Sequence, residues 1–458
     1  MTSTLSFFGG VGAVTGANFL LELKTEKGGV YKIVVDCGLL QGVQHADDFN
    51  HSHFPYDPSS IDVLLITHAH ADHIGRVAKL IKDGFHGVIY STPATLDLVK
   101  VMLDDQLSLI TRDAEAKGIE PMYTKKDVEK TLSLWNTIPY HTLFKIKEDV
   151  TLYFKDAGHI LGSAMIEIVR NGKKIVFTGD LGNSPSLFLR DTESITDAHY
   201  MVMESVYGDR NHEPKDMRRL KLKTIIQRVI AERKTLVIPV FSLERTQDIL
   251  YEINDLVESK QIDPVPTFID SPLAIKVTDI YRQWAREFKQ DIQERIKSGD
   301  DIFDFSKLKM VAHMKDSSSI QDISGPKIIM AGSGMSSGGR IVFHEKRFLP
   351  DKDAILLFVG YQSMGTLGRK IEEGAKKVII QGEEIKVNAE IESINGYSSH
   401  KDSDHLVEFA SESSGTLKQV FIAMGEPKAA MFLAQRMRDY AGIKAVCPEL
   451  GNTYTLDL

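Results

Sequence analysis

The stretch Thr67 to Gly75 constrains this chain more than any other, because it packs three histidines and an aspartate into one short segment. The apolar residues before it predict a buried strand over 62–66, and those after it predict an amphipathic helix over 74–81, which is followed by predicted helices over 93–110 and 124–135. His68 and His70 alternate on an extended backbone and point the same way, while Asp72 and His73 open the helix. Zinc takes nitrogen and carboxylate ligands, so this loop predicts a site for two adjacent metal ions.

Composition restricts the class of protein. The chain has 458 residues, 42% of them hydrophobic, which favours two domains in a globular protein. A net charge of -8 argues against a globally basic nucleic-acid binder but not against a local basic groove. The segment 7–21 contains glycines and lacks a basic start, so it predicts two strands and a turn rather than a signal peptide or membrane span. With only Cys37 and Cys447 present, we expect a cytoplasmic protein without a membrane partner.

Three further loops carry candidate ligands. Asp36 ends an apolar run, where it can cap a turn or orient a metal-bound histidine. His159 lies in a glycine-containing loop after the predicted strand 150–154, and Asp180 follows the predicted strand 174–177. A carboxylate has two oxygens and can bridge two metal ions. His159 and Asp180 therefore add a fifth and a sixth ligand to the first cluster.

Taken in chain order, these residues resemble the signature of the metallo-β-lactamase superfamily. That resemblance implies an αββα sandwich, with two β-sheets between outer helices and the metal loops at one edge. It also implies that one zinc is held by three histidines, that Asp72 and His73 hold the second, that Asp180 bridges the two, and that Asp36 orients the ligands. The three histidines are His68, His70 and His159.

The second half alternates predicted strands and helices, which indicates a parallel, helix-covered α/β domain. The predicted strands include 235–239, 267–270, 327–330 and 354–359. A basic helix over 215–232 has two open interpretations, a solvated outer face or an RNA contact. The stretch 291–319 is polar and predicts a helix plus a loop.

This half resembles the β-CASP nucleases, in which an α/β domain is inserted into the metallo-β-lactamase domain. The matching pieces begin at Glu204, Ile238, Gly332, Gly360 and Tyr397. The resemblance places the first part of the metallo-β-lactamase domain at 1–212, the β-CASP domain at 213–397 and the second part of the metallo-β-lactamase domain at 398–458. It covers nearly the whole chain.

The resemblance also implies catalytic and substrate-binding roles. His400 would be the general acid with Glu204 as its partner, and these two join Asp36 and Asp72 in the catalytic set. Four side chains in glycine-containing loops of the insert are candidates for binding substrate phosphates, although ordinary turns have the same composition. They are Ser333, Ser337, Arg340 and Arg369.

One position departs from the family pattern. Where a histidine usually precedes Gly-Glu, this chain has Met424 before Gly425 and Glu426. A thioether binds zinc poorly compared with imidazole, so we expect weaker occupancy of the second zinc position.

Together these features predict a zinc-dependent ribonuclease that hydrolyses single-stranded RNA, as an endonuclease, a 5′-exonuclease or both. The alternatives are a DNA nuclease of the same family and a catalytically weakened RNA-binding member. The large insert disfavours a small-molecule hydrolase. A homodimer is an expectation from the family resemblance only.

Overall fold

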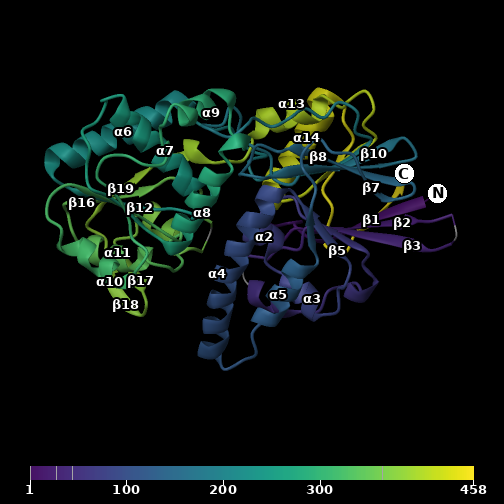
Figure 1. Ribbon diagram of the computed structural model, residues 1–458, viewed down its shortest axis with the longest axis horizontal. Helices are drawn as coiled ribbons and strands as arrows, with labels where there is room; N and C mark the ends of the chain where they lie inside the picture. The colour runs from purple at the N-terminus through teal and green to yellow at the C-terminus, as the bar shows by residue number, and fades with distance from the viewer. Residues whose placement is uncertain (1, 27, 44, 364) are drawn as a thin grey trace. The chain divides into compact units, whose positions relative to one another are not determined.

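The computed structural model describes residues 2–26, 28–43, 45–363 and 365–458. By its internal contacts the chain divides into two compact units. The first unit combines residues 1–211 with Ser399–Leu458, and the insert unit is His212–Ser398. Figure 1 shows both, with the two chain ends beside each other in the first unit, where strands β1 (Thr2–Gly9) and β22 (Thr453–Asp457) pair antiparallel.

Two seven-stranded sheets form the centre of the first unit. The first sheet has the order β22-β1-β2-β3-β4-β5-β6 and the second has the order β21-β20-β11-β10-β9-β8-β7. The remaining strands of the first sheet are β2 (Asn18–Lys24), β3 (Val30–Val35), β4 (Val63–Leu65), β5 (Val88–Ser91) and β6 (Trp135–Thr137). Those of the second are β7 (Phe144–Lys147), β8 (Val150–Asp156), β9 (Ala164–Arg170), β10 (Lys173–Phe177), β11 (Tyr200–Met203), β20 (Gln419–Ile422) and β21 (Ala445–Val446).

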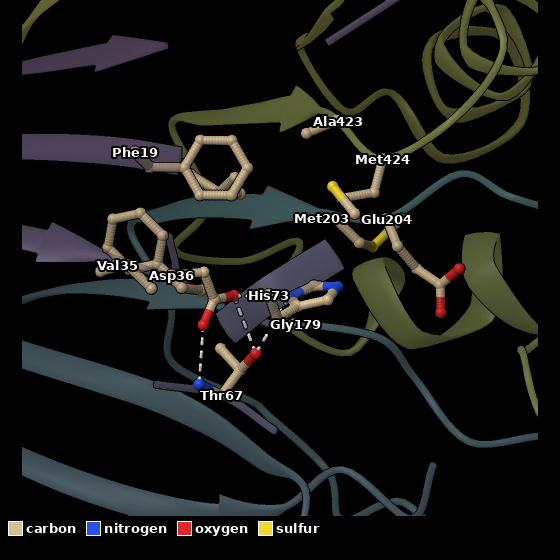
Figure 2. A pocket seen from close by; sticks show the side chains of 12 residues that line it. Phe19, Val35, Asp36, Thr67, His73, Gly179, Met203, Glu204, Ala423 and Met424 are labelled. Carbon is tan, nitrogen blue, oxygen red and sulfur yellow. Dashed lines mark hydrogen bonds and ion pairs between the residues drawn. The ribbon is translucent and has the colours of Figure 1, made fainter. Parts of the chain in front are cut away.

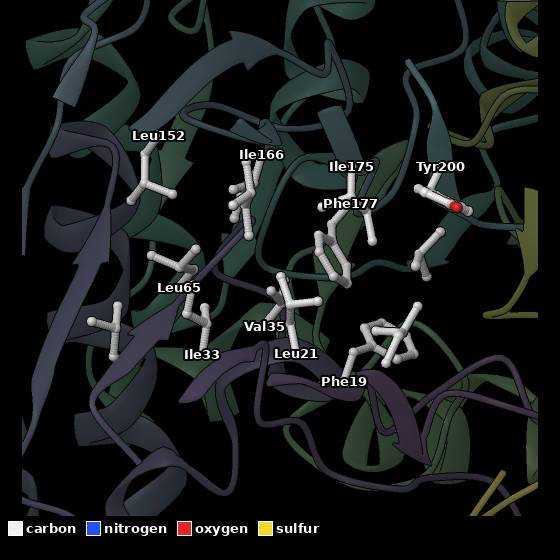
Figure 3. Close-up of a cluster of buried hydrophobic side chains, with 14 of the residues drawn as sticks. Phe19, Leu21, Ile33, Val35, Leu65, Leu152, Ile166, Ile175, Phe177 and Tyr200 are labelled. Carbon is white, nitrogen blue, oxygen red and sulfur yellow. The ribbon is translucent and has the colours of Figure 1, made fainter. Parts of the chain in front are cut away.

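The hydrophobic core of this unit lies between the two sheets. Along β8 every second residue is buried, as expected for a strand with one face on a core. In Figure 3, Phe19 and Leu21 of β2 face Ile175 and Phe177 of β10 across the interface. Burying a large apolar side chain contributes about 1.5–3 kcal/mol, so this layer holds the metal loops on a rigid base.

Helices cover the outer faces of the sandwich. Leu406 and Phe409 of one helix and Leu433 and Met437 of another pack with Met201 and other residues of the second sheet. The helices of this unit are α1 (Ala46–His51), α2 (Ala71–Ile74), α3 (Val77–Lys82), α4 (Pro93–Lys117), α5 (Lys125–Ser133), α13 (Ser403–Ser411) and α14 (Pro427–Ala441). The expected αββα architecture is confirmed.

Three local expectations for the first unit were wrong. The helix predicted over 74–81 is split into α2 and α3, because the Arg76 amide leaves the helix and donates to the Cys37 carbonyl at 2.9 Å. Trp135 belongs to β6 rather than to the preceding helix, and its indole donates to Ser91 of β5 at 2.9 Å. Helix α4 continues to Lys117, seven residues beyond the predicted end at Ile110.

The insert unit is built on a parallel six-stranded sheet with the order β14-β13-β15-β12-β16-β19. Its strands are β12 (Thr235–Pro239), β13 (Thr267–Asp270), β14 (Leu308–Met310), β15 (Lys327–Ala331), β16 (Ala354–Phe358) and β19 (Glu390–Ser393), with a separate hairpin of β17 (Lys377–Ile380) and β18 (Glu383–Lys386). Its helices are α6 (Lys215–Glu232), α7 (Arg245–Glu258), α8 (Pro272–Gln283), α9 (Gln290–Lys297), α10 (Met314–Ser319), α11 (Ile341–Phe348) and α12 (Leu367–Glu372).

The expected helix-covered parallel domain is therefore confirmed. The sequence analysis missed β14, which lies inside the polar stretch 291–319 and pairs with β13 at the edge of the sheet. Short edge strands carry little apolar signal, because only part of their surface is buried. Within the described ranges, no helix is both long and apolar enough to cross a membrane.

Candidate active site

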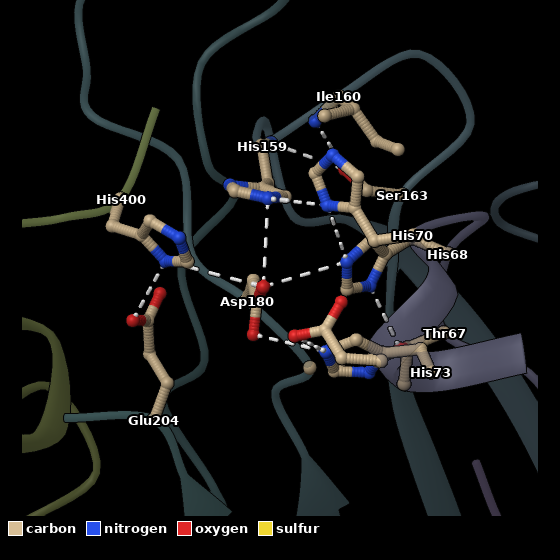
Figure 4. A network of polar contacts seen from close by, with 12 residues as sticks. Thr67, His68, His70, His73, His159, Ile160, Ser163, Asp180, Glu204 and His400 are labelled. Atoms are coloured by element: carbon tan, nitrogen blue, oxygen red, sulfur yellow. Dashed lines mark hydrogen bonds and ion pairs between the residues drawn. The ribbon is translucent and has the colours of Figure 1, made fainter. Parts of the chain in front are cut away.

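The candidate ligands of the first unit lie in loops that follow strands. His68 and His70 follow β4 on extended backbone, and His70 is the residue before α2. His159 follows β8 and Asp180 follows β10, two strands that run in the same direction because each pairs antiparallel with β9. The sandwich thus delivers side chains that are far apart in the sequence to one edge (Figure 4).

Three imidazole nitrogens and one carboxylate oxygen converge at a first position. His68 Nε2 lies 3.1 Å from His70 Nδ1, which lies 3.3 Å from His159 Nε2. Asp180 Oδ2 lies 3.4 Å from His68 Nε2 and 3.5 Å from His159 Nε2. Ligands placed tetrahedrally about 2.0–2.2 Å from a metal ion are themselves roughly 3.3–3.6 Å apart. The four side chains therefore fit a divalent metal ion.

The charge state of these histidines suits metal binding. Burial lowers the pKa of His68, His70 and His159, and neighbouring imidazoles lower it further. All three are therefore neutral at neutral pH and offer lone pairs. Burial alone would raise the pKa of Asp180, but His73 and His68 hold it well below the usual range. Neutral imidazoles around an ionised carboxylate are a suitable donor set for zinc.

Groups behind the ligands fix which ring nitrogen faces the metal position. The Thr67 hydroxyl donates to Asp36 Oδ2 at 2.8 Å and lies 3.0 Å from His68 Nδ1, so it can accept that ring's proton. His159 Nδ1 donates to the Ser399 carbonyl at 3.2 Å. Both rings therefore keep Nε2 unprotonated, a role typical of partners that orient metal ligands.

A second position lies on the other side of Asp180. His73 Nε2 faces Asp180 Oδ1 at 3.4 Å and Asp72 Oδ2 at 3.9 Å. Among the described residues, neither His73 Nε2 nor Asp180 Oδ1 has a hydrogen-bond partner, although both are buried. His73 Nδ1 bonds to Asp36 Oδ2 at 2.7 Å, which leaves Nε2 for another partner. Two buried polar atoms that lack partners fit a second metal ion between Asp72, His73 and Asp180.

A small cavity borders His73, one of the residues of the second position. His73 lines a cavity of about 10 Å³ together with Met203, Met424 and Phe177 (Figure 2). Met424 is 3% exposed, and its amide donates to the Gly10 carbonyl at 2.6 Å. Met424 thus lines the same cavity as His73, at the place in the chain where the family pattern has a histidine. The second position has three protein side chains, compared with four at the first.

His400 and Glu204 form a pair beside the first position. His400 Nδ1 bonds to Glu204 Oε2 at 3.0 Å and lies 4.0 Å from Asp180 Oδ2. Burial by itself lowers the pKa of His400, but the Glu204 carboxylate raises it to about 9. His400 is held there because the Lys401 amide donates to the Leu181 carbonyl at 2.8 Å. The pair places a protonated imidazole next to the metal ligands.

Asp36, one of the sequence candidates, lies directly behind the ligands. It is 1% exposed, and it accepts the Thr67 amide at 2.8 Å in addition to the Thr67 hydroxyl and His73. Sequence analysis identified Asp36 but missed Thr67 and the Ser399 carbonyl. Thr67 could have been noticed as the hydroxyl residue next to the first histidine, whereas a backbone carbonyl leaves no signal in the sequence.

The four substrate-binding candidates of the insert unit are not gathered like the metal ligands. The Arg340 guanidinium is bound by Asp270 at 2.6 Å and by the carbonyls of Val311 and Ala312. Arg369 Nε pairs with Glu373 at 2.7 Å. The hydroxyl of Ser333 accepts the amide of Ser337 at 3.0 Å, within the same loop. In this structure the two arginines bind carboxylates of their own unit, and the two serines shape their loop.

Helix α6 shows the same pattern of internal pairing. The buried Arg218 donates to the Gly396 carbonyl at 2.8 Å, and Arg219 pairs with Asp255. Lys221 pairs with Glu213 at 2.7 Å. The basic residues of this helix bind groups of the insert unit, so their number in the sequence is no argument for an RNA contact.

Comparisons with known proteins agree with this arrangement. Residues 23–206 match the model of the metallo-beta-lactamase superfamily domain, 246–371 match the Beta-Casp domain, and 384–448 match the Zn-dependent metallo-hydrolase RNA specificity domain. The chain is also 34% identical over 402 residues to "Ribonuclease TTHA0252" from Thermus thermophilus, covering 88% of this chain and 89% of that protein. The chain belongs to the β-CASP family of the metallo-β-lactamase superfamily. Membership of this hydrolase family implies that a divalent metal binds at the site.

Other relatives carry a different name. The β-CASP chain is 30% identical to "Transcription termination factor FttA" from Pyrococcus abyssi, covering 86% of this chain and 62% of that protein. It is also 30% identical to the FttA of Methanosarcina mazei, covering 93% and 68%. A crystal structure of a protein of unknown function from Enterococcus faecalis covers both chains fully with a TM-score of 0.55 at 11% identity, which shows a shared fold alone.

Proposed function

We propose that this β-CASP protein is a zinc-dependent ribonuclease that hydrolyses phosphodiester bonds of single-stranded RNA. The observation that carries the proposal is the convergence of three neutral imidazoles and Asp180 beside the His400–Glu204 pair. The relative named as a ribonuclease, which this chain covers over most of its length, supports the choice of RNA.

Two zinc ions, held by the side chains of the first and second positions, would supply an activated water and neutralise the charge that develops on the phosphate. The protein's own residues then have separate tasks. Asp36 and Thr67 keep the ligand rings in place, and Asp180 keeps its negative charge between the two positions. The second position has fewer protein ligands, so we propose that it binds zinc more weakly.

His400 is the proposed general acid. Its Nδ1 is bound to Glu204, so the proton on Nε2 is the one available for the leaving oxygen. The Glu204 carboxylate favours the protonated ring, and the Leu181 amide fixes Glu204 by donating to Oε1 at 2.5 Å. A phosphodiester leaving group needs such a proton near neutral pH, which is what this pair provides.

Cleavage of matched RNA and DNA tests the proposal. Single strands labelled at the 5′ or the 3′ end are incubated with wild type, with His400→Ala and with a control, His86→Ala, which changes an exposed loop histidine. We expect zinc-dependent cutting of RNA that chelation abolishes, that His400→Ala slows by about 10²–10⁴-fold and that His86→Ala leaves intact. The two labels separate internal from terminal cleavage. Preferential cutting of DNA, or RNA binding without cutting, would replace the proposal with one of the two alternatives.

The insert borders at 213 and 397, a homodimer and a cytoplasmic location remain proposals. Limited proteolysis tests the borders, and light scattering tests the oligomeric state.

A further inference from the structure

Three loops meet at the carboxyl edge of the insert sheet, following the neighbouring strands β15, β12 and β16. The Gln362 amide joins two of them, because its Nε2 donates to the Gly334 carbonyl at 3.0 Å and to the Gly360 carbonyl at 3.2 Å. A methyl group on Gly360 would lie 3.9 Å from Arg245 Nε, at the start of α7. The loops after β12, β15 and β16 therefore form one continuous edge.

The order of the strands marks this edge as a place where α/β sheets bind ligands. From β12 the chain leads through α7 to β13, toward the β14 edge of the sheet. From β16 it leads to β19, which is the strand at the opposite edge. Where the connections of two neighbouring parallel strands depart in opposite directions, α/β proteins commonly bind ligands at the carboxyl ends of those strands. The loop after β12 lies at this point of the sheet.

Phe241 lies in that loop and exposes its aromatic ring. It is 40% exposed, although it comes directly after the buried Val240. Its backbone is held in place because the Phe241 carbonyl accepts the Thr246 amide at 3.2 Å and the Thr246 hydroxyl at 2.7 Å. An aromatic ring on a loop that is already fixed can bind a flat apolar group with little further loss of conformational entropy.

A glycine of the neighbouring loop supports the ring from behind. A methyl group on Gly334 would lie 2.7 and 2.8 Å from two ring carbons of Phe241, so no side chain larger than hydrogen fits there without moving the ring. Polar groups lie on the adjoining strand ends, where the hydroxyls of Ser242 and Ser271 are 3.2 Å apart beside Gly332. The ring is thus anchored on one side, open on another, and next to hydrogen-bonding groups.

We propose that Phe241 is a stacking platform for one base of the RNA substrate. This inference rests on the proposed ribonuclease function and adds a binding residue to it. Unpaired bases stack on exposed aromatic rings, whereas bases inside a duplex are already stacked on each other. The platform therefore selects single-stranded RNA and fixes the register of the strand on the insert unit.

Binding measured without metal tests the platform separately from cleavage. A fluorescent single-stranded RNA is titrated in excess chelator with wild type, Phe241→Ala, Phe241→Trp and Phe432→Ala. The last variant is the control, because Phe432 is 46% exposed on α14 of the first unit. Stacking of one base on an aromatic ring contributes enough binding free energy that its loss should weaken RNA binding about tenfold or more. We expect that loss for Phe241→Ala only, with Phe241→Trp binding as wild type.

A second set of RNAs, each with one abasic position, identifies the stacked base. In wild type, one abasic position should weaken binding about tenfold, and in Phe241→Ala the same position should have no further effect. Equal binding by wild type and Phe241→Ala, while zinc-loaded wild type cuts RNA, would overturn the platform alone. Wild type that neither binds nor cuts RNA would overturn the proposed function itself.

Discussion

Each of the two units buries a cluster of histidine and aspartate, and the two clusters are completed differently. In the insert unit, Asp270 is fully buried and accepts Arg340 at 2.6 Å, His344 at 2.7 Å and Ser317 at 2.5 Å. In the first unit, three ring nitrogens converge with Asp180, and the buried His73 Nε2 and Asp180 Oδ1 lack a hydrogen-bond partner among the described residues. The Asp270 cluster satisfies its own hydrogen bonds, whereas the Asp180 cluster needs a cation from outside.

Residue type alone does not distinguish a structural cluster from a functional one. Both contain a buried carboxylate and imidazole, and both lie at the ends of strands. What differs is whether the protein supplies every partner, since a buried polar group without one is costly.

Removing the central carboxylate should give opposite results in the two clusters. Asp180→Asn should lose nearly all bound zinc, because it removes the bridging charge, while the protein stays folded. Asp270→Asn should keep its zinc but lose about 3–5 kcal/mol of stability, because Arg340 would lack its buried partner. Elemental analysis and urea denaturation measure the two effects. Full zinc retention by Asp180→Asn would show that the Asp180 carboxylate is not needed to hold the metal.

His400 should matter for catalysis and not for metal binding. We expect His400→Ala to reduce RNA cleavage by about 10²–10⁴-fold, because the leaving oxygen loses its proton donor. Zinc content should be unchanged, since the first position keeps its four side chains. Single-turnover cleavage and elemental analysis on the same preparation provide the measurement. A parallel loss of zinc would place His400 among the ligands.

Glu345 is a buried carboxyl in the insert unit that differs from both Asp270 and Asp180, because it is expected to be protonated rather than ionised. This difference should make the stability of the insert unit depend on pH. Burial raises its pKa to about 8, and Ser336 donates a hydrogen bond to it. In the folded protein the Glu345 carboxyl therefore keeps its proton up to a higher pH, whereas in the unfolded chain it releases the proton above the usual pKa of 4.5. Stability should fall as pH rises from about 5 to about 8, by roughly 3–5 kcal/mol, and then level off.

The variant Glu345→Gln should remove most of this pH dependence. Urea denaturation of the chelated protein at pH 6 and at pH 9 measures it. The control is Glu383→Gln, because Glu383 is an exposed residue of the same unit. If Glu345→Gln lost stability with pH as steeply as wild type, another group would be responsible.

The smallest effect concerns the second metal position. Met424→His should strengthen zinc binding there by about tenfold, because an imidazole replaces a thioether beside His73. Stepwise competition with a chelator distinguishes the weaker zinc from the tighter one. Met203→Leu is the control, since it changes the same cavity without adding a ligand. Two equally tight zinc ions in wild type would contradict the difference between the positions.

Much of this arrangement could be predicted from sequence, because the ligands follow strands with strong apolar patterns. The motif 67–75, His159 and Asp180 each stand directly after such a strand, and sheet edges bring strand ends together. The parallel insert was likewise predictable from the alternation of strands and helices. The roles of the ligands are still proposals, although their positions are observed.

Other features depend on contacts that the sequence does not display. Arg340 was a candidate for phosphate binding, but the carboxylate that binds it comes from β13, 70 residues earlier. The split between α2 and α3 depends on the carbonyl of Cys37. Which ring nitrogen of His159 carries the proton depends on the carbonyl of Ser399. Backbone groups carry no residue-specific signal, so such partners appear only in three dimensions.

The central claim is that the nitrogens of the first unit converge on a metal ion, and anomalous diffraction tests it most directly. Crystals grown with zinc and measured at the zinc absorption edge should show a strong peak between His68 Nε2, His70 Nδ1, His159 Nε2 and Asp180. A weaker peak should lie between Asp72, His73 and Asp180. Crystals with no peak among these residues, or with zinc bound only elsewhere, would contradict the claim.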